Sequence, residues 1–218
     1  MYKREELERL SEKGDTHAMM ELGIQSYDTG DFGRAIELLE AVTLCDGLNA
    51  RALWTLGRAY VEHNGNDKEI AEKVISLWVQ ASQLGNEEAC LCLGKAYHNK
   101  YDGKLNIELD CEKAEHWYSE ALRLGQKVSL FYLGKLYHYK SPRTVEDAVM
   151  AYTYYNSFYV FTSQDKDKFT SQREEAINGI GAIEKSADEI NGGGNFFCAL
   201  KRSNSNLLGR LSSRLKFV

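Results

Sequence analysis

Small and large apolar residues recur along the chain with helical spacing. In four places a small residue is followed four and five residues later by leucine and glycine, and in the last three a tyrosine follows the glycine by three residues. Residues at these offsets lie on one face of an α-helix. The four segments are Ala18…Leu22-Gly23, Ala52…Leu56-Gly57…Tyr60, Ala89…Leu93-Gly94…Tyr97 and Ser129…Leu133-Gly134…Tyr137. This period is typical of helix-pair repeats.

A second amphipathic pattern lies between these segments. Its apolar residues stand at offsets 0, 3, 4 and 7, which again define a single helical face. The four runs are Ala35-Leu38-Leu39-Val42, Val74-Leu77-Trp78-Ala81, Ala114-Trp117-Tyr118-Ala121 and Ala151-Tyr154-Tyr155-Phe158. Either pattern alone is common, but their alternation four times predicts four helix pairs.

Glycine and capping residues agree with this pairing. A glycine in the first helix lets the two helices of a pair approach closely, because it has no side chain. The predicted caps are Gly85 and Gly125 at the ends of second helices, and Asp31, Asp110 and Thr144 with Asp147 at their starts. Differences in length fall in the connection inside a pair, as in residues 99–109, so the spacing of the core residues is preserved.

At these residues the chain resembles the SEL-one-like repeat family, which is related to the tetratricopeptide repeats. The family carries Ala-x-x-x-Leu-Gly-x-x-Tyr in the first helix of a unit and Ala-x-x-Trp-Tyr-x-x-Ala in the second. The third unit matches at Ala89, Leu93, Gly94, Tyr97, Ala114, Trp117, Tyr118, Ala121 and Gly125. The resemblance implies an all-α fold, a right-handed superhelix of about four helix-turn-helix repeats with terminal helices, whose concave side binds proteins or peptides.

The repeat register divides the chain into segments. We expect an N-terminal helix in residues 1–14, a repeat array in 15–190, and a glycine-rich linker with a basic tail in 191–218. Within the array the units cover 15–47, 48–85, 86–125 and 126–162, followed by a capping helix at 168–190. A terminal unit is expected to depart from the consensus, because one of its faces meets solvent.

Composition and charge narrow the function classes. The net charge is −5, and residues 196–218 contain five basic and no acidic residues, so the body is still more acidic and nucleic acid is not an expected partner. The five cysteines, at positions 45, 90, 92, 111 and 198, are odd in number and irregularly spaced, which favours reduced thiols. With no secretory signal or membrane-spanning run in the sequence, we expect a cytoplasmic protein and do not expect a membrane as its partner.

Candidate partner-binding residues follow from the repeat register. In related tetratricopeptide arrays the ligand-facing positions lie on the first helices, and three columns result for this chain. The first column lies three residues before each glycine and contains Met20, Trp54, Leu91 and Phe131. The second lies directly after each glycine and contains, besides Ile24, the cations Arg58, Lys95 and Lys135. The third lies one turn later and contains, besides Tyr27 and Val61, the histidines His98 and His138. Cations in register on neighbouring helices suit an acidic segment or a terminal carboxylate, with aromatic residues as apolar anchors. The alternative is that these cations are solvated helix positions.

Other chemistry finds little support in the sequence. The histidines and cysteines lack metal-ligand spacing, and Gly192-Gly193-Gly194 lacks the strand and helix context of a phosphate loop, so we expect no metal, cofactor or catalytic residue. In the tail, Leu207, Leu211 and Leu215 share one helical face, which favours a segment that caps the array over one that binds a partner or an anionic membrane.

Two functions fit these observations. The first is an adaptor that binds a protein or peptide on the concave face of the array. The second is a specific inhibitor or immunity protein that uses the same fold to block an enzyme or toxin, for which an acidic body suits a basic target. An enzyme would require a site that the sequence does not reveal.

Overall fold

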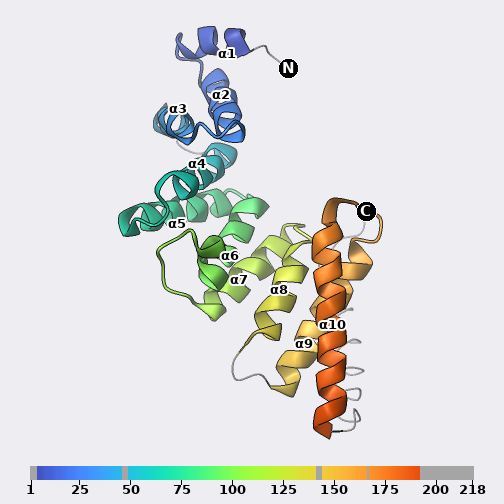
Figure 1. Cartoon of the computed structure of the whole chain (residues 1–218). Coiled ribbons are helices and arrows are strands. Elements are labelled where there is room, and N and C mark those ends of the chain that lie inside the picture. Colours follow the sequence, from blue (N-terminus) through green and yellow to red (C-terminus); the bar gives the residue numbers. More distant parts are fainter. Residues whose placement is uncertain (1–3, 46–48, 141–143, 166, 192–218) are drawn as a thin grey trace. The chain divides into compact units, whose positions relative to one another are not determined.

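The computed structural model consists of α-helices joined by short connections (Figure 1). It describes residues 4–45, 49–140, 144–165 and 167–191, with side chains described up to Ser186. The helices are α1 (Arg4–Ser11), α2 (Thr16–Asp28), α3 (Phe32–Cys45), α4 (Ala50–Asn64), α5 (Lys68–Gln83), α6 (Glu87–Gly103), α7 (Cys111–Arg123), α8 (Ser129–His138), α9 (Val145–Phe161) and α10 (Thr170–Asn191), with a 3-10 turn η1 (Asp167–Phe169) before α10. No β-strand occurs in these ranges, which confirms the predicted all-α class.

The helices form two compact units. Unit 1 covers Met1–Trp117 and unit 2 covers Tyr118–Val218, so the boundary falls inside α7. In unit 1 each helix packs against the next from α1 to α6, and in unit 2 α8 packs against α9 and α9 against α10. Antiparallel neighbours joined by short connections are the expected outcome of the alternating helix patterns.

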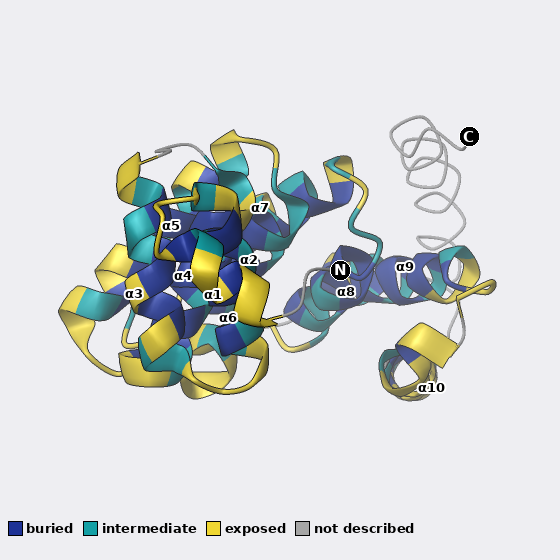
Figure 2. Cartoon of the chain, turned by 90° about the horizontal axis from the view of Figure 1, so that it is seen from above, coloured by how far each residue is buried: buried dark blue, intermediate teal, exposed yellow. Residues whose placement is uncertain are grey.

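The core of unit 1 is built by the two predicted stripes. Small residues such as Ala35, Ala52 and Ala89 are fully buried, and so is the large Trp78 at the centre of α5. Figure 2 shows the buried residues on the faces that the helices turn toward one another, while the opposite faces are exposed. Small residues on one helix leave room for large ones on its neighbour, which gives the close packing of a protein interior.

Three of the four repeat glycines, Gly23, Gly57 and Gly134, lie where helices cross, as predicted. A Cβ atom placed on Gly23 would stand 2.8 Å from Leu39 Cγ, and one on Gly57 would overlap the Trp78 ring. In unit 2 a Cβ on Gly134 would stand 2.5 Å from Tyr155 Cδ1. Each glycine therefore makes room for a large side chain on the second helix of its own pair.

The predicted caps are also confirmed. The backbone at Gly85 and Gly125 has φ of +83° and +105°, a left-handed conformation that glycine adopts without steric cost. Asp31 and Asp110 accept hydrogen bonds from the backbone N–H groups three residues later, at 3.1 and 3.0 Å. At the start of α9, Thr144 and Asp147 form a reciprocal capping box. These groups satisfy donors and acceptors that a helix end leaves unpaired.

Unit 2 is closed by α10, which packs on both α9 and α8. The ring of Tyr155 lies between Gly134 of α8 and Gly179 of α10, whose added Cβ would stand 2.6 Å from Tyr155 Cε2. Arg173, 7% exposed, donates hydrogen bonds to the Tyr159 carbonyl and the Thr162 hydroxyl at 2.7 and 2.8 Å. Thus α10 takes the place that the first helix of a further pair would take. The glycine-rich linker and the tail predicted for 191–218 lie almost wholly outside the described residues.

Candidate functional site

Arg58 of α4 is held between two aromatic rings in unit 1. Its guanidinium carbon lies 4.4 Å from the ring centre of Tyr27 on α2 and 4.9 Å from that of Trp54 one turn earlier on α4. Among the described residues Arg58 forms no hydrogen bond or ion pair, so its N–H groups are not engaged by another side chain. An arginine stacked on rings keeps its planar fork in one orientation, ready for bidentate contact with a carboxylate.

Trp54 is fixed in turn by neighbours on two other helices. Its indole Nε1 donates to Cys92 Sγ of α6 at 3.4 Å, and its backbone carbonyl accepts a hydrogen bond from Trp78 Nε1 of α5 at 3.2 Å. Burial raises the pKa of the Cys92 thiol, so the sulfur is a neutral acceptor here. Burial likewise raises the pKa of Tyr27. The aromatic support of Arg58 is therefore neutral and well anchored.

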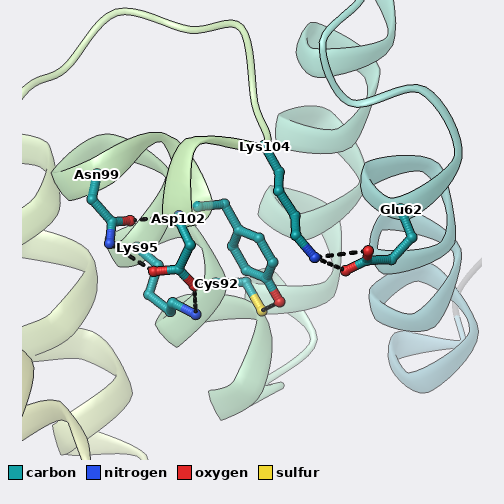
Figure 3. Close-up of polar contacts among 7 residues, drawn as sticks. Glu62, Cys92, Lys95, Asn99, Asp102 and Lys104 are labelled. Carbon is teal, nitrogen blue, oxygen red and sulfur yellow. Dashed lines mark hydrogen bonds and ion pairs between the residues drawn. The ribbon is translucent and has the colours of Figure 1, made fainter.

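A second cation predicted on the first helices of unit 1, Lys95 on α6, is paired within the chain. Its Nζ lies 2.7 Å from Asp102 Oδ2 and 4.5 Å from the ring centre of Tyr101 (Figure 3). The Lys95 side chain is 17% exposed and that of Asp102 is 58% exposed. The lysine is thus held in the protein surface, whereas its carboxylate partner stands largely in solvent.

Asp102 belongs to a left-handed turn at the end of α6. Lys100, Tyr101 and Asp102 have φ of +55°, +52° and +59°. Each such non-glycine residue costs roughly 1–2 kcal/mol. Asn99 stabilises the turn, because its Nδ2 donates to Asp102 Oδ1 at 2.9 Å and its Oδ1 accepts from the Asp102 backbone N–H at 3.0 Å. A run of three left-handed residues persists only where surrounding contacts hold it.

Contacts on both sides of the turn supply that support. The Tyr101 ring packs on Trp78 with 5.2 Å between centres, and its hydroxyl accepts a hydrogen bond from Cys92 Sγ at 3.8 Å. Burial strongly raises the pKa of Tyr101, which therefore stays neutral. Beyond the turn, Lys104 Nζ lies 2.6 Å from Glu62 Oε1 near the end of α4, as Figure 3 shows. The turn is clamped between α4 and α6.

The register-predicted residues fall into different environments. Trp54, Leu91 and His98 are half-buried in unit 1, whereas Met20 is only 9% exposed and packs in the core, so it offers a partner little surface. In unit 2, Phe131 is 3% exposed and His138 is half-buried beside the Tyr155 ring. Lys135 of unit 2 is paired with Glu175 of α10 at 2.8 Å. These residues belong to two units, and within unit 1 the structure brings Trp54 together with Arg58.

Sequence reasoning missed Tyr101, Asp102 and Lys104, which lie in the connection inside the third pair. The sequence signal was limited to Asp102-Gly103, a pair of residue types common in turns. No periodic pattern marks a residue whose position depends on a left-handed backbone. Lys104 also borders a hollow of about 500 Å³ formed with the end of α4 and the connection to α5.

The described residues offer no group of three or more histidine, cysteine, aspartate or glutamate side chains able to hold a metal ion. None of the four cysteines in the described ranges is in a disulfide. Within those ranges, too, no helix combines the length and apolar character needed to cross a membrane.

The succession of packed helix pairs defines the class of the molecule as a helix-pair repeat protein. No family model matches the chain. Over 97 residues it is 31% identical to the ERAD-associated E3 ubiquitin-protein ligase component HRD3A of Arabidopsis thaliana. The match covers 40% of this chain and 14% of the plant protein, so the chain corresponds to a small part of that relative.

Solved structures extend the comparison to the fold. A protective antigen of uropathogenic Escherichia coli, c5321, which displays an SLR fold, matches 93% of this chain and 43% of its own with 20% identity and a TM-score of 0.59. The MamA protein matches 93% of this chain and 96% of its own with 18% identity and a TM-score of 0.57. A Sel1 repeat protein from Oxalobacter formigenes is 27% identical over 62% of this chain and 54% of its own, with a TM-score of 0.47. At these identities the likeness is one of fold: the chain shares the SLR fold that c5321 displays.

Proposed function

We propose that the chain is an adaptor that binds an acidic segment of another protein on the first-helix face of unit 1, the surface carried by α2, α4 and α6. SEL-one-like repeats are non-catalytic scaffolds that generally mediate contacts between proteins. The similarity to a component of a ubiquitin-ligase assembly agrees with such a role. By resemblance to the family, this face is the concave side of the array.

The observation that carries the proposal is the position of Arg58. Two aromatic rings hold its guanidinium, and among the described residues no carboxylate neutralises it. Stacking on the rings itself contributes about 0.5–1 kcal/mol at an exposed site, and it leaves the N–H groups of the guanidinium available to an anion. Hydrogen bonds between charged groups are roughly twice as strong as neutral ones, and the guanidinium fork fits a carboxylate in two-point contact. Trp54 supplies an apolar surface beside that contact.

The test begins with a random dodecapeptide display library selected on the purified full chain. We expect enriched peptides to contain aspartate, glutamate or a free C-terminal carboxylate, and their synthetic forms to bind more weakly as salt is added. Arg58→Ala should weaken binding at least about tenfold, which corresponds to about 1.4 kcal/mol. Arg58→Lys should restore only part of it, because an ammonium group lacks the planar fork.

The matched control is Arg34→Ala. Arg34 lies on the second helix α3, is half exposed, and pairs with Glu37 at 3.2 Å, so its removal changes net charge equally without touching the first-helix face. Equal affinity of the Arg58→Ala and wild-type chains for every selected peptide, or a library without enriched acidic sequences, would contradict the proposal. An inhibitor of the same fold would differ by binding one enzyme tightly and stoichiometrically while suppressing its activity.

A further inference from the structure

The site proposed above contains two cations, Arg58 and Lys95, and a carboxylate of the chain itself already pairs with Lys95. Arg58 has rings as neighbours, whereas Lys95 is engaged by the Asp102 carboxylate at 2.7 Å. The two cations are linked through Cys92, because Arg58 lies over the Trp54 ring and Lys95 over the Tyr101 ring, and both aromatic residues hydrogen-bond to the Cys92 sulfur. A carboxylate from this chain therefore stands where a second carboxylate of an acidic partner would bind.

The turn that carries Asp102 is built in an unusual way. Three consecutive non-glycine residues adopt the left-handed conformation, and Asp102 is anchored by Asn99 and Lys95 (Figure 3). Its side chain is 58% exposed, so it can leave Lys95 for solvent without crossing any packed layer. Release would also let Lys100 and Asp102 return to ordinary backbone conformations, which offsets part of the lost ion pair.

We propose that Asp102 is an internal competitor for the acidic partner: it neutralises Lys95 in the unbound chain and is displaced by a carboxylate of the bound segment. This inference rests on the proposed function and adds two features to it. The preferred ligand carries two acidic groups, one for Arg58 and one for Lys95. Binding also opens the turn at residues 99–104, whereas Tyr101, anchored on Trp78 and Cys92, keeps its place.

The variant that separates competition from folding is Asp102→Asn. Asparagine adopts the left-handed conformation as readily as aspartate, and its side-chain oxygen still accepts the hydrogen bond from Asn99. Only the charge facing Lys95 is lost. The control is Glu37→Gln, which removes one exposed negative charge on α3, away from the first-helix face. Helical circular dichroism and melting midpoints of both variants should match those of the wild type.

Titration of the acidic peptides selected on the wild-type chain tests the inference. Asp102→Asn should bind two-acid peptides roughly twofold to fivefold more tightly, the range open to a partly exposed ion pair, and Glu37→Gln should bind them as the wild type does. Peptides with the second acid changed to its amide should lose this gain. In the wild type, peptide binding should speed hydrogen exchange at the amide of Leu105, which bonds to the Lys100 carbonyl across the turn.

Failure of this inference can be told from failure of the proposed function. If Arg58→Ala weakens binding while Asp102→Asn leaves it unchanged or weakens it, Asp102 is not a competitor and the acidic site stands. If neither variant changes the affinity of any peptide, the site itself is wrong. Slower exchange at Leu105 on binding would likewise overturn displacement of the turn.

Discussion

The position after the repeat glycine holds a cation in both units, and the two environments differ. In unit 1, Arg58 lies between the rings of Tyr27 and Trp54. In unit 2, Lys135 lies 2.8 Å from Glu175, which α10 contributes. The repeat register treats these positions as equivalent, but Arg58 faces rings of α2 and of its own helix α4, whereas Lys135 faces a carboxylate of the following helix α10.

The difference follows from where each pair stands in the array. A helix pair inside an array is followed by another pair, whereas the last pair needs a cover for its open side. In unit 2, α10 provides this cover: Gly179 packs on Tyr155, and Glu175 neutralises Lys135. Unit 1 keeps an arginine oriented by aromatic rings, and this is the group that the proposed acidic partner would contact.

The largest expected effect comes from the helix crossing that α10 covers. Gly134→Leu should lower the free energy of unfolding by about 3 kcal/mol, because Tyr155 is enclosed by Gly134 on one side and Gly179 on the other. Gly23→Leu in unit 1 should cost only about 1 kcal/mol, since a flexible Leu39 can move aside. Urea unfolding of the full chain, followed by circular dichroism, measures both.

Gly181→Ala is the control for these substitutions. Gly181 lies on α10 with no neighbouring atom within 4 Å of an added Cβ, so alanine should leave stability unchanged or raise it. Equal costs for Gly134→Leu and Gly23→Leu would show that α10 does not confine Tyr155.

A smaller effect is expected at the helix starts. Asp147 of α9 is buried, receives hydrogen bonds from Lys140 Nζ at 2.8 Å and from the Thr144 backbone N–H at 2.9 Å, and completes the capping box. Burial acts to raise its pKa, but these hydrogen bonds outweigh it and hold the pKa below its usual value. Asp147→Asn should therefore cost about 1 kcal/mol at neutral pH.

The pH dependence provides the check. Because the pKa of Asp147 is lowered in the folded chain, its contribution is present above the ordinary aspartate pKa of about 4 and is lost as the pH falls through the lowered value. Wild type and variant should thus converge in acid. Asp67→Asn, at the exposed N-cap of α5, should be neutral, since asparagine caps equally well. A cost at Asp147 that persists unchanged in acid would show that its charge is not the cause.

The smallest effect on stability is expected for the ion pair of Lys135 with Glu175, which distinguishes Lys135 from Arg58. Glu175→Gln removes the partner of Lys135, and because the glutamate is 44% exposed the loss should stay within roughly 0.2–1 kcal/mol. Added salt should reduce it further. Glu174→Gln, at the exposed neighbouring position of α10, should change unfolding less. Identical free energies of unfolding for Glu175→Gln and Glu174→Gln at low salt would show that Glu175 does not neutralise Lys135, and so would contradict the difference drawn between Lys135 and Arg58.

Helix identity and helix pairing could be predicted from local patterns. Offsets such as those of Ala52, Leu56 and Gly57 define a buried face wherever they occur, because helical geometry alone sets which residues share a side. Caps such as Gly85 and Asp110 act on backbone groups of the same turn, so their effect is also local. For this reason the packing of α2 on α3, α4 on α5 and α8 on α9, and the capping residues, agree with the patterns in the sequence.

Contacts between residues distant in sequence had to come from the tertiary structure. Met20 and Phe131 share a register position with Trp54 but are buried, because packing around each pair differs. The pairing of Lys135 with Glu175 depends on where α10 lies. The left-handed turn that brings Asp102 to Lys95 is unfavourable for its residues taken alone and is held only by neighbours such as Asn99. Local periodicity shows which residues share a buried helix face. Whether a cation on that helix is paired with a carboxylate depends on which other segment of the chain lies beside it.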